Sequence, residues 1–139
     1  MSSSDAEGIV RAFIEQGLNA HDASACRAVL APDFSFHAGT ATAGLDAYLE
    51  QREEGWSWSS DWQIQIQDVV ANGDRIAVRA TAGGTHRGVA RTPFGDAKPT
   101  GRRVETSWIA IYRVHEGRIA EAWSEADMVS IFRGLGALS

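Results

Sequence analysis

The sequence predicts an α+β fold in which a curved, mostly antiparallel sheet is folded over helices from the N-terminal part of the chain. Apolar residues follow a helical spacing in the first third of the chain. Polar and apolar residues then alternate, as in strands, from Asp61 onward, and helical spacing returns only at residues 128–136. This order favours one sheet closed over helices into a cone, whose mouth can hold a small apolar ligand.

Two helices are predicted to open the chain. Ser4 and Glu7 have the spacing of a capping box, and the first helix is expected to end near Asn19. Its inward face carries apolar or small residues at Ile9, Val10, Phe13, Ile14, Gly17 and Leu18. Asp22 is the expected N-cap of a second, short helix, which Pro32 stops.

A short strand and a third helix are expected next. Residues 34–38 alternate, so His37 points away from the face that the two phenylalanines share. The third helix begins within 44–51 and has on one side Leu45, Tyr48 and Leu49. Trp56 and Trp58 follow in a connection rich in glycine and serine. Three interpretations of these two tryptophans are open: they line a cavity for a flat ligand, they cover the edge of the core, or they pack between subunits.

Antiparallel strands account for the middle of the chain. Two one-sided strands are joined by a hairpin at Asn72-Gly73, and their apolar residues include Trp62, Ile64, Ile66, Ile76, Val78 and Ala80. Gly83-Gly84 is expected to mark a bend or bulge. Residues 85–91 read as another strand carrying His86, and residues 92–101 as a loop with two prolines and two glycines.

The C-terminal part is predicted to hold a long strand, a tight turn, a last strand and a short helix. One face of the long strand carries Val104, Thr106, Trp108, Ala110, Tyr112 and Val114. Ile109 and Ile111 make its other face apolar too, which predicts burial on both sides. The turn lies at Glu116-Gly117, the last strand spans about 118–124, and Gly136 ends a helix with an apolar stripe of Met128, Ile131, Phe132 and Leu135.

Length, charge and hydropathy limit the class of protein. The 139 residues fit one domain, 1–139. A net charge of −5 without a basic tract gives no support to nucleic-acid binding. No apolar run approaches ~20 residues, and the N-terminus lacks the basic region and apolar core of a signal peptide. We therefore expect a cytoplasmic protein that binds neither nucleic acid nor membranes.

The residues that are scarce in the sequence limit the chemistry. Cys26, the only cysteine, is expected to be a small buried residue rather than a reactive thiol. Lys98, the only lysine, lies in a proline-bounded loop, which argues against a Schiff base. The histidines show no paired metal-ligand spacing, and glycine-rich nucleotide motifs are missing. An enzyme with this sequence is expected to use side chains alone, without a metal or cofactor.

Several short motifs, in order, resemble one known family, the SnoaL-like polyketide cyclases. They are Gly84-Thr-His-Arg-Gly, Pro99-Thr-Gly-Arg, Tyr112-Arg, Gly117-Arg-Ile-Ala-Glu-Ala-Trp-Ser-Glu-Ala-Asp and Leu135-Gly. The resemblance implies the NTF2-like α+β cone and a homo-oligomer that pairs through the open face of the sheet. It also implies a cofactor-free aldol condensation that closes a ring on an anthraquinone methyl ester. Related members act as hydroxylases, and a binding protein without catalysis is a third alternative.

The resemblance also implies roles for individual residues. Asp127, at the junction of the last strand and helix, matches the general acid/base, with a pKa that burial raises. His86 matches a second residue of the same pocket. The expected substrate-binding side chains are His37, Tyr48, Trp56, Trp108 and Trp123. Each assignment has a plainer alternative: Asp127 is also a normal helix N-cap, His86 a satisfied strand histidine, and Glu121 either a second pocket carboxylate or the partner of an arginine.

Overall fold

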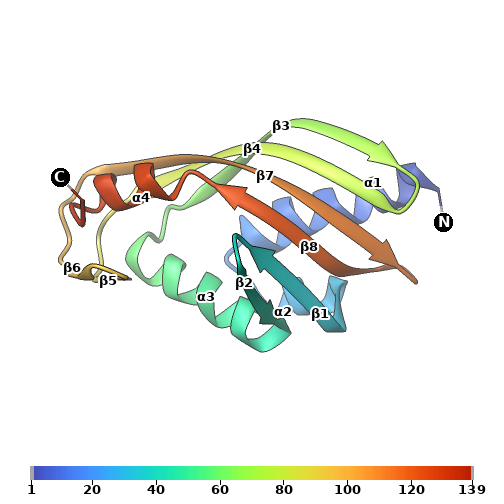
Figure 1. Ribbon diagram of the computed structural model, residues 1–139, viewed down its shortest axis with the longest axis horizontal. Coiled ribbons are helices and arrows are strands. Elements are labelled where there is room, and N and C mark those ends of the chain that lie inside the picture. Colours follow the sequence, from blue (N-terminus) through green and yellow to red (C-terminus); the bar gives the residue numbers. More distant parts are fainter. Residues whose placement is uncertain (1, 139) are drawn as a thin grey trace.

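A strongly curved sheet is the frame of the protein, as the computed structural model of residues 2–138 shows (Figure 1). Within these residues it has six strands in the order β2-β1-β8-β7-β4-β3. The strands are β1 (Leu30–Ala38), β2 (Ala41–Gly44), β3 (Gln63–Asn72), β4 (Arg75–Thr85), β7 (Arg103–His115) and β8 (Arg118–Ala126). Only the β1–β8 pair is parallel, so the predicted α+β fold with a mostly antiparallel sheet is confirmed.

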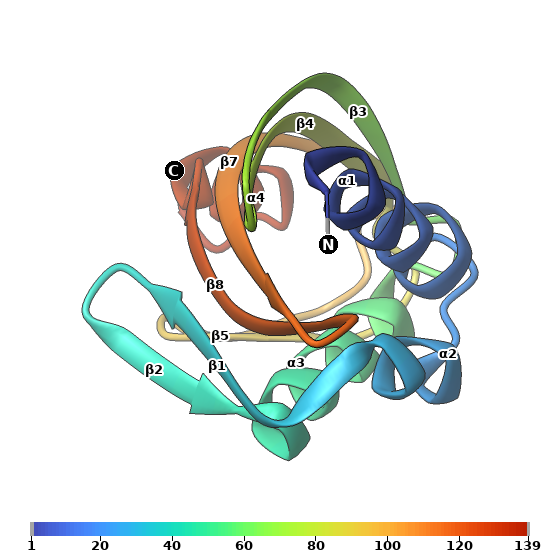
Figure 2. The same cartoon turned by 90° about the vertical axis from the view of Figure 1, so that its right-hand side faces the viewer.

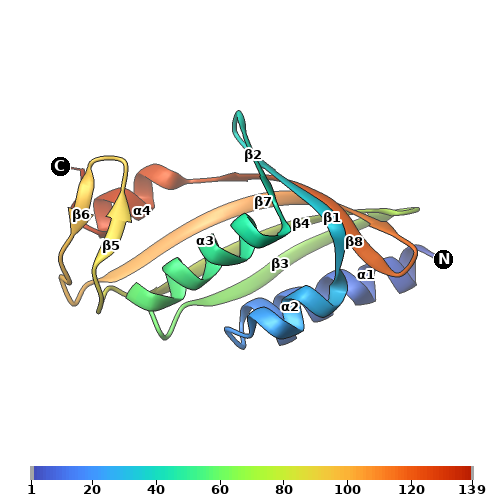
Figure 3. The same cartoon turned by 90° about the horizontal axis from the view of Figure 1, so that it is seen from below.

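The helices pack on one face of this sheet, called the inner face below. They are α1 (Ser3–Ala12), the π-helical segment η1 (Phe13–Leu18), α2 (Ala23–Val29), α3 (Leu45–Trp58) and α4 (Met128–Gly134). Figure 2 shows the sheet curling around them, and Figure 3 shows the small hairpin of β5 (Ala90–Thr92) and β6 (Gly95–Ala97) near α4. None of the helices described is both long and apolar enough to cross a membrane.

The opposite face of the sheet, called the outer face below, stays open in the single chain. On β7 the inward residues Val104, Ala110 and Val114 are buried, whereas Ile109 is 54% and Ile111 42% exposed. The prediction that this strand is buried on both sides is therefore wrong for one chain by itself. The prediction fails because the helices between residues 2 and 138 all pack against the inner face.

A β-bulge decides which side chains of β8 face outward. Val114 pairs with Ile119, but the next pair on the ladder is Arg113 with Glu121, so Ala120 is the extra residue. Because one extra residue reverses the alternation, Ile119 is buried whereas Glu121 lies on the outer face. Simple alternation would have placed both on the same face, and the sequence gives no signal for the bulge.

Several predicted boundaries differ from the observed ones. The capping box uses Ser2 and Asp5 rather than Ser4 and Glu7. The second helix ends at Val29, and Pro32 lies within β1, near a register shift in the β1–β8 pairing. Asp22 caps the second helix as predicted.

The segment after β4 differs most from its prediction. Residues 85–91 do not form one strand of their own. Thr85 ends β4, which continues through Gly83-Gly84, and Ala90 begins β5. The segment 92–101, which was predicted to be a loop, contains most of the β5–β6 hairpin. Its prolines and glycines favoured a loop over strands in the prediction. The turns at Asn72-Gly73 and Glu116-Gly117 are confirmed, with left-handed φ of 61° at Gly73 and 79° at Gly117.

Candidate functional site

His86 is fully buried where the end of β4 meets the loop after β6. The backbone N–H of Thr100 donates to Nδ1 at 3.3 Å, so the ring proton sits on Nε2 and points at the carbonyl oxygen of Ala97, 3.2 Å away. The Trp58 ring packs edge-on against the imidazole at 5.7 Å. Both ring nitrogens are thus occupied, as a satisfied histidine requires, and catalysis by His86 stays a prediction.

The glycines on either side of His86 allow another segment to approach closely. A Cβ on Gly84 would lie 2.9 Å from the Cα of Trp62, and one on Gly88 would lie 2.6 Å from the carbonyl oxygen of Ser57. Backbone bonds from Arg87 and Gly88 to the carbonyl oxygen of Trp58 complete the contact. The Gly84-Thr-His-Arg-Gly motif therefore joins the sheet to the end of α3.

Asp61 strengthens the same junction. Its carboxylate accepts bonds from the backbone N–H of Thr85 at 2.7 Å, from the Thr85 hydroxyl at 2.8 Å and from the Ser59 hydroxyl at 3.1 Å. These bonds, chiefly those from Thr85, lower the pKa of Asp61 to about 2. The carboxylate is therefore ionised at neutral pH and acts as a fixed acceptor for this corner of the fold.

Asp127 is the N-cap of α4, as its plainer alternative predicts. Its carboxylate accepts the backbone N–H of Ser130 at 3.1 Å and the Ser130 hydroxyl at 2.6 Å. These bonds lower its pKa, with the hydroxyl contributing most, and the side chain is exposed. The expectation that burial raises the pKa of Asp127 is wrong, because the carboxylate lies at the rim of the sheet rather than in the core.

Asp127 nevertheless lines a pocket, one of about 440 Å³. This pocket opens on the outer face across β3, β4 and β7, and polar side chains dominate its wall, among them Gln63, Gln65, Arg103, Glu105 and Ser107. A carboxylate in such surroundings stays ionised at neutral pH, so it can accept a proton from an acidic ligand.

Three of the expected substrate-binding residues lie on the inner side of the sheet. Tyr48 of α3 is buried, and burial raises its pKa. Trp56, two turns further along α3, stacks on His21 at 5.0 Å, and Trp108 of β7 is half-buried against the same core. Phe36 of β1 packs against the same core, with its ring 4.8 Å from that of Tyr48. Phe36, Tyr48, Trp56 and Trp108 are together called the inner aromatic group below.

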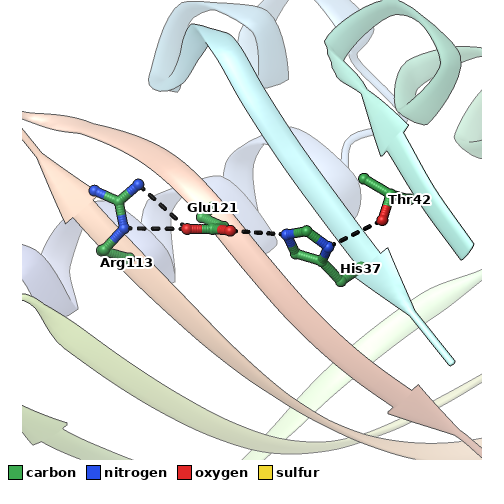
Figure 4. A network of polar contacts seen from close by, with 4 residues as sticks. All are labelled: His37, Thr42, Arg113 and Glu121. Carbon is green, nitrogen blue, oxygen red and sulfur yellow. Dashed lines mark hydrogen bonds and ion pairs between the residues drawn. The ribbon is translucent and has the colours of Figure 1, made fainter. Parts of the chain in front are cut away.

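The other two, His37 and Trp123, lie on the outer face, and Figure 4 shows the polar network to which His37 belongs. His37 Nε2 is 2.8 Å from Glu121, and its Nδ1 is 3.1 Å from the Thr42 hydroxyl. Arg113 contacts the other oxygen of Glu121 at 3.3 Å. The bond from His37, followed by that from Arg113, lowers the pKa of Glu121, which is thus the partner of an arginine. The Trp123 ring stacks on His37 at 5.5 Å.

The predicted residues are therefore not brought together in one site. His86, Tyr48, Trp56 and Trp108 lie on the inner side, whereas Asp127, His37 and Trp123 lie at the outer face. A second outer pocket of about 380 Å³ has in its wall His37, Ile109, Ile111 and Trp123. Residues 2–138 contain no group of three or more His, Cys, Asp or Glu side chains placed to hold a metal ion.

Sequence reasoning missed Arg52 on the inner side. Its guanidinium carbon lies 4.8 Å from the centre of the Tyr48 ring and 5.6 Å from that of Phe36. The signal was present: Arg52 follows Tyr48 by four residues and precedes Trp56 by four, so it interrupts an otherwise apolar helical stripe.

Solved structures from bacteria share the fold. AclR from Streptomyces galilaeus, a proposed hydroxylase, aligns at TM-score 0.87 and 24% identity, covering 99% of this chain and 84% of that one. IdmH from Streptomyces antibioticus, a proposed polyketide cyclase, aligns at TM-score 0.78 and 28% identity over 94% of this chain and 98% of that one.

A third structure, TsrD from Streptomyces laurentii, aligns at TM-score 0.83 and 22% identity over 99% of both chains. A search of curated protein sequences found no match. The model of one protein family, however, matches residues 8–135, nearly the whole chain. By this match the chain belongs to the SnoaL-like polyketide cyclase family.

Proposed function

We propose that the protein is a cofactor-independent enzyme that closes a ring on an aromatic polyketide ester by an intramolecular aldol reaction. The observation that carries this proposal is the family match over residues 8–135. The inner aromatic group of Phe36, Tyr48, Trp56 and Trp108 supports a flat, apolar substrate. A flat, apolar ligand is also the class of substrate that a polyketide cyclase would bind.

In the proposed reaction the ionised Asp127 removes a proton from the carbon between the ketone and the ester of the substrate. The resulting carbanion attacks a carbonyl carbon of the same molecule, which forms the new carbon–carbon bond and an alkoxide. The alkoxide then takes the proton back from Asp127. Because the pKa of Asp127 is lowered, the carboxylate is a weak base, and much of the acidity must come from the conjugated substrate.

The direct test is incubation with an anthraquinone methyl ester that carries a β-keto ester chain, without oxygen and without nicotinamide. We expect a cyclised isomer of unchanged mass, detected by chromatography with mass spectrometry. A product heavier by one oxygen atom that forms only with oxygen and a reductase would instead assign hydroxylation. The absence of any product from several such esters would contradict catalysis of this class.

Binding without turnover is a second candidate, and one observation favours it. The aromatic group on the inner side contains no carboxylate, whereas Asp127 lies at the outer face with a lowered pKa. A general base is normally within hydrogen-bond reach of the proton that it removes. Tight binding of the ester with no product would support this candidate over the cyclase.

We also propose that the outer face pairs with a second copy of the chain. Residues that pair with one another across neighbouring strands form rows that cross the sheet. One such row carries exposed apolar side chains at Val70 and Ile111 and continues to Trp123. The row on one side holds two arginines and one glutamate, Arg75, Arg113 and Glu121, with a net charge of +1. The row on the other side holds Asp68, Arg79, Ile109 and Glu125, with a net charge of −1.

A two-fold axis along the apolar row would place the positive row of one copy opposite the negative row of the other. Apolar residues would then meet at the centre, and unlike charges would meet on both sides. Such pairing would bury the side chains of Ile109 and Ile111. The strand β7 would then be covered on both faces, as its apolar pattern predicts.

Ile111→Glu is expected to break this dimer, because it places a carboxylate in the centre of the apolar row. We expect the dissociation constant to rise by roughly 100-fold or more, measured by sedimentation equilibrium. The matched control is Val129→Glu, since Val129 is 49% exposed on α4 and does not belong to the apolar row. A wild-type protein that sediments as a monomer, or an Ile111→Glu variant of unchanged mass, would contradict the proposed pairing.

A further inference from the structure

Two pockets adjoin on the outer face of the sheet. The pocket of about 440 Å³ that contains Asp127, called the polar pocket below, has Ser107 in its wall. The pocket of about 380 Å³, called the apolar pocket below, has Ile109 and Glu125. Ile109 follows Ser107 by two residues on β7, and Asp127 likewise follows Glu125. Since residues two apart in extended chain point to the same face, the walls of the two pockets meet there.

The combined space, called the outer groove below, changes from polar to apolar along β7. Its outward side chains are Arg103, Glu105 and Ser107 in the polar pocket and Ile109 and Ile111 in the apolar pocket. Both isoleucines are exposed in the single chain. From Ser107 to Ile111 the strand spans roughly 13 Å. Such a groove fits a flat, apolar ring system that carries a short polar chain.

Trp123 forms a restrained wall at the apolar end of the groove. The His37 ring stacks on it at 5.5 Å, and the guanidinium carbon of Arg75 lies 5.1 Å from the centre of the Trp123 ring. His37 is in turn held by Glu121 and Thr42 (Figure 4). Trp123 can therefore add an aromatic contact to those of the isoleucines without first being ordered by the ligand.

The backbone of the sheet separates Asp127 from the inner aromatic group. Trp108 of that group directly follows Ser107 on β7, and consecutive residues of a strand point to opposite faces. Ser107 shares the polar pocket with Asp127, whose carboxylate is ionised at neutral pH because its pKa is lowered. A ligand against Trp108 would lie across the sheet from this pocket, whereas a ligand in the apolar pocket lies beside Asp127 on the same face.

We propose that the outer groove, rather than the inner aromatic group, binds the substrate, an uncharged flat aromatic ester whose rings lie on Ile109 and Ile111 and whose polar chain reaches Asp127. This inference rests on the proposed aromatic ester substrate and changes the place where it is held. Pairing through the outer face would cover the same groove. Bound ligand and a second copy of the chain therefore exclude one another.

The charges of the groove select an uncharged ligand. Its wall contains the carboxylates of Glu105, Glu125 and Asp127, and Arg103 already pairs with Glu105 at 2.9 Å. Like charges brought together in a binding site disfavour the complex. An ester or amide is therefore expected to bind more tightly than the corresponding carboxylate.

The first test locates the ligand through the NMR signals of isoleucine methyl groups labelled with carbon-13. The probe is anthraquinone-2-carboxamide, which is flat and uncharged. We expect its ring currents to shift the signals of Ile109 and Ile111, which Ile109→Val and Ile111→Val assign. The signals of Ile64 and Ile66 should stay unchanged, because both pack against the core on the inner side, with Ile66 in the same row as Trp108. Shifts at Ile64 and Ile66 alone would overturn the inference.

A pair of variants separates the groove from the rest of the outer face. Ile109→Ser is expected to weaken binding of the carboxamide by roughly tenfold, measured by calorimetric titration. The matched control is Val70→Ser, because Val70 is an exposed apolar residue of the same face but lines neither pocket. Its binding should be no weaker than that of the wild type. Both side chains are exposed, so both variants are expected to fold, which their melting temperatures check. Equal affinity of the wild type and Ile109→Ser would overturn the inference, as would equal losses in the two variants.

Two further measurements test charge and exclusion. Anthraquinone-2-carboxylate is expected to bind more weakly than the carboxamide, by roughly threefold or more, and tighter binding would contradict the selection of an uncharged ligand. Excess carboxamide should raise the dimer dissociation constant in sedimentation equilibrium, because only the monomer exposes the groove. An unchanged constant would contradict the shared surface.

The outcomes distinguish this inference from the proposed function. Failure of the wild type to bind either probe would overturn the inference together with the proposed substrate class. Binding in the outer groove without turnover of the ester would support the inference and overturn only the cyclase. Turnover accompanied by shifts at Ile64 and Ile66 alone would overturn only the inference.

Discussion

Asp127→Asn is expected to lower the rate of ring closure by about 100-fold or more, the range of general acid–base assistance. Asparagine has the same shape and is as good an N-cap as aspartate, so its side chain can still accept the backbone N–H of Ser130. The negative charge and the ability to take up a proton are removed, while the backbone cap remains. The measurement is the single-turnover rate with the anthraquinone ester, alongside the melting temperatures of both proteins.

Ser130→Ala is the control for this variant. It removes the hydroxyl that contributes most to the lowered pKa of Asp127 and leaves the carboxylate in place. The pKa of Asp127 should rise toward its ordinary value. Since the ionised form is the active one, the acid limb of the pH–rate profile should move to higher pH. Full turnover in Asp127→Asn would show that this carboxylate is a helix cap and nothing more.

The fold could be predicted from the sequence because each face of each element has a regular pattern. Phe34 and Phe36 were expected on one face and His37 on the other, and the structure confirms the opposed positions of Phe36 and His37. Local turn chemistry likewise located the hairpins at Asn72-Gly73 and Glu116-Gly117. These signals depend on neighbouring residues alone, which a single sequence contains.

The site could be predicted only in part, because it depends on which face of the sheet each strand presents. The bulge at Ala120 directs Glu121 and Trp123 outward. The residue types of this strand do not indicate that it contains a bulge. At Asp127 one residue satisfies two patterns, a helix cap and an acid/base group. Sequence cannot separate them, since the surroundings that set the pKa come from Ser130 and from the exposed rim of the sheet.

The apolar second face of β7 shows a different limit. Ile109 and Ile111 predicted burial on both sides, yet the single chain covers only one. A pattern in the sequence reports what is buried in the working protein, which includes any partner. The disagreement is therefore itself an observation in favour of pairing through the outer face.

Gly84→Ala is expected to destabilise the fold by roughly 1–3 kcal/mol, the usual cost of overpacking a well-packed position. A methyl group there would overlap the Ser59 hydroxyl and lie within 3.0 Å of two backbone atoms of Trp62. Backbone atoms cannot rotate aside, and the pairing of Gly84 with Val104 of β7 holds this end of β4 in place. The change should appear in urea unfolding as a lower midpoint.

Gly55→Ala is the matched control, on the helix that ends at the same junction. A Cβ at Gly55 would have no atom within 4 Å, and alanine favours a helix over glycine by about 1 kcal/mol. This variant should be as stable as the wild type or more stable. Equal stability of Gly84→Ala and the wild type would contradict the close approach of β4 to residues 59–62. The expected difference would instead explain the Gly84-Thr-His-Arg-Gly motif as a packing requirement, in which Gly84 admits the Trp62 backbone and His86 fastens the loop after β6.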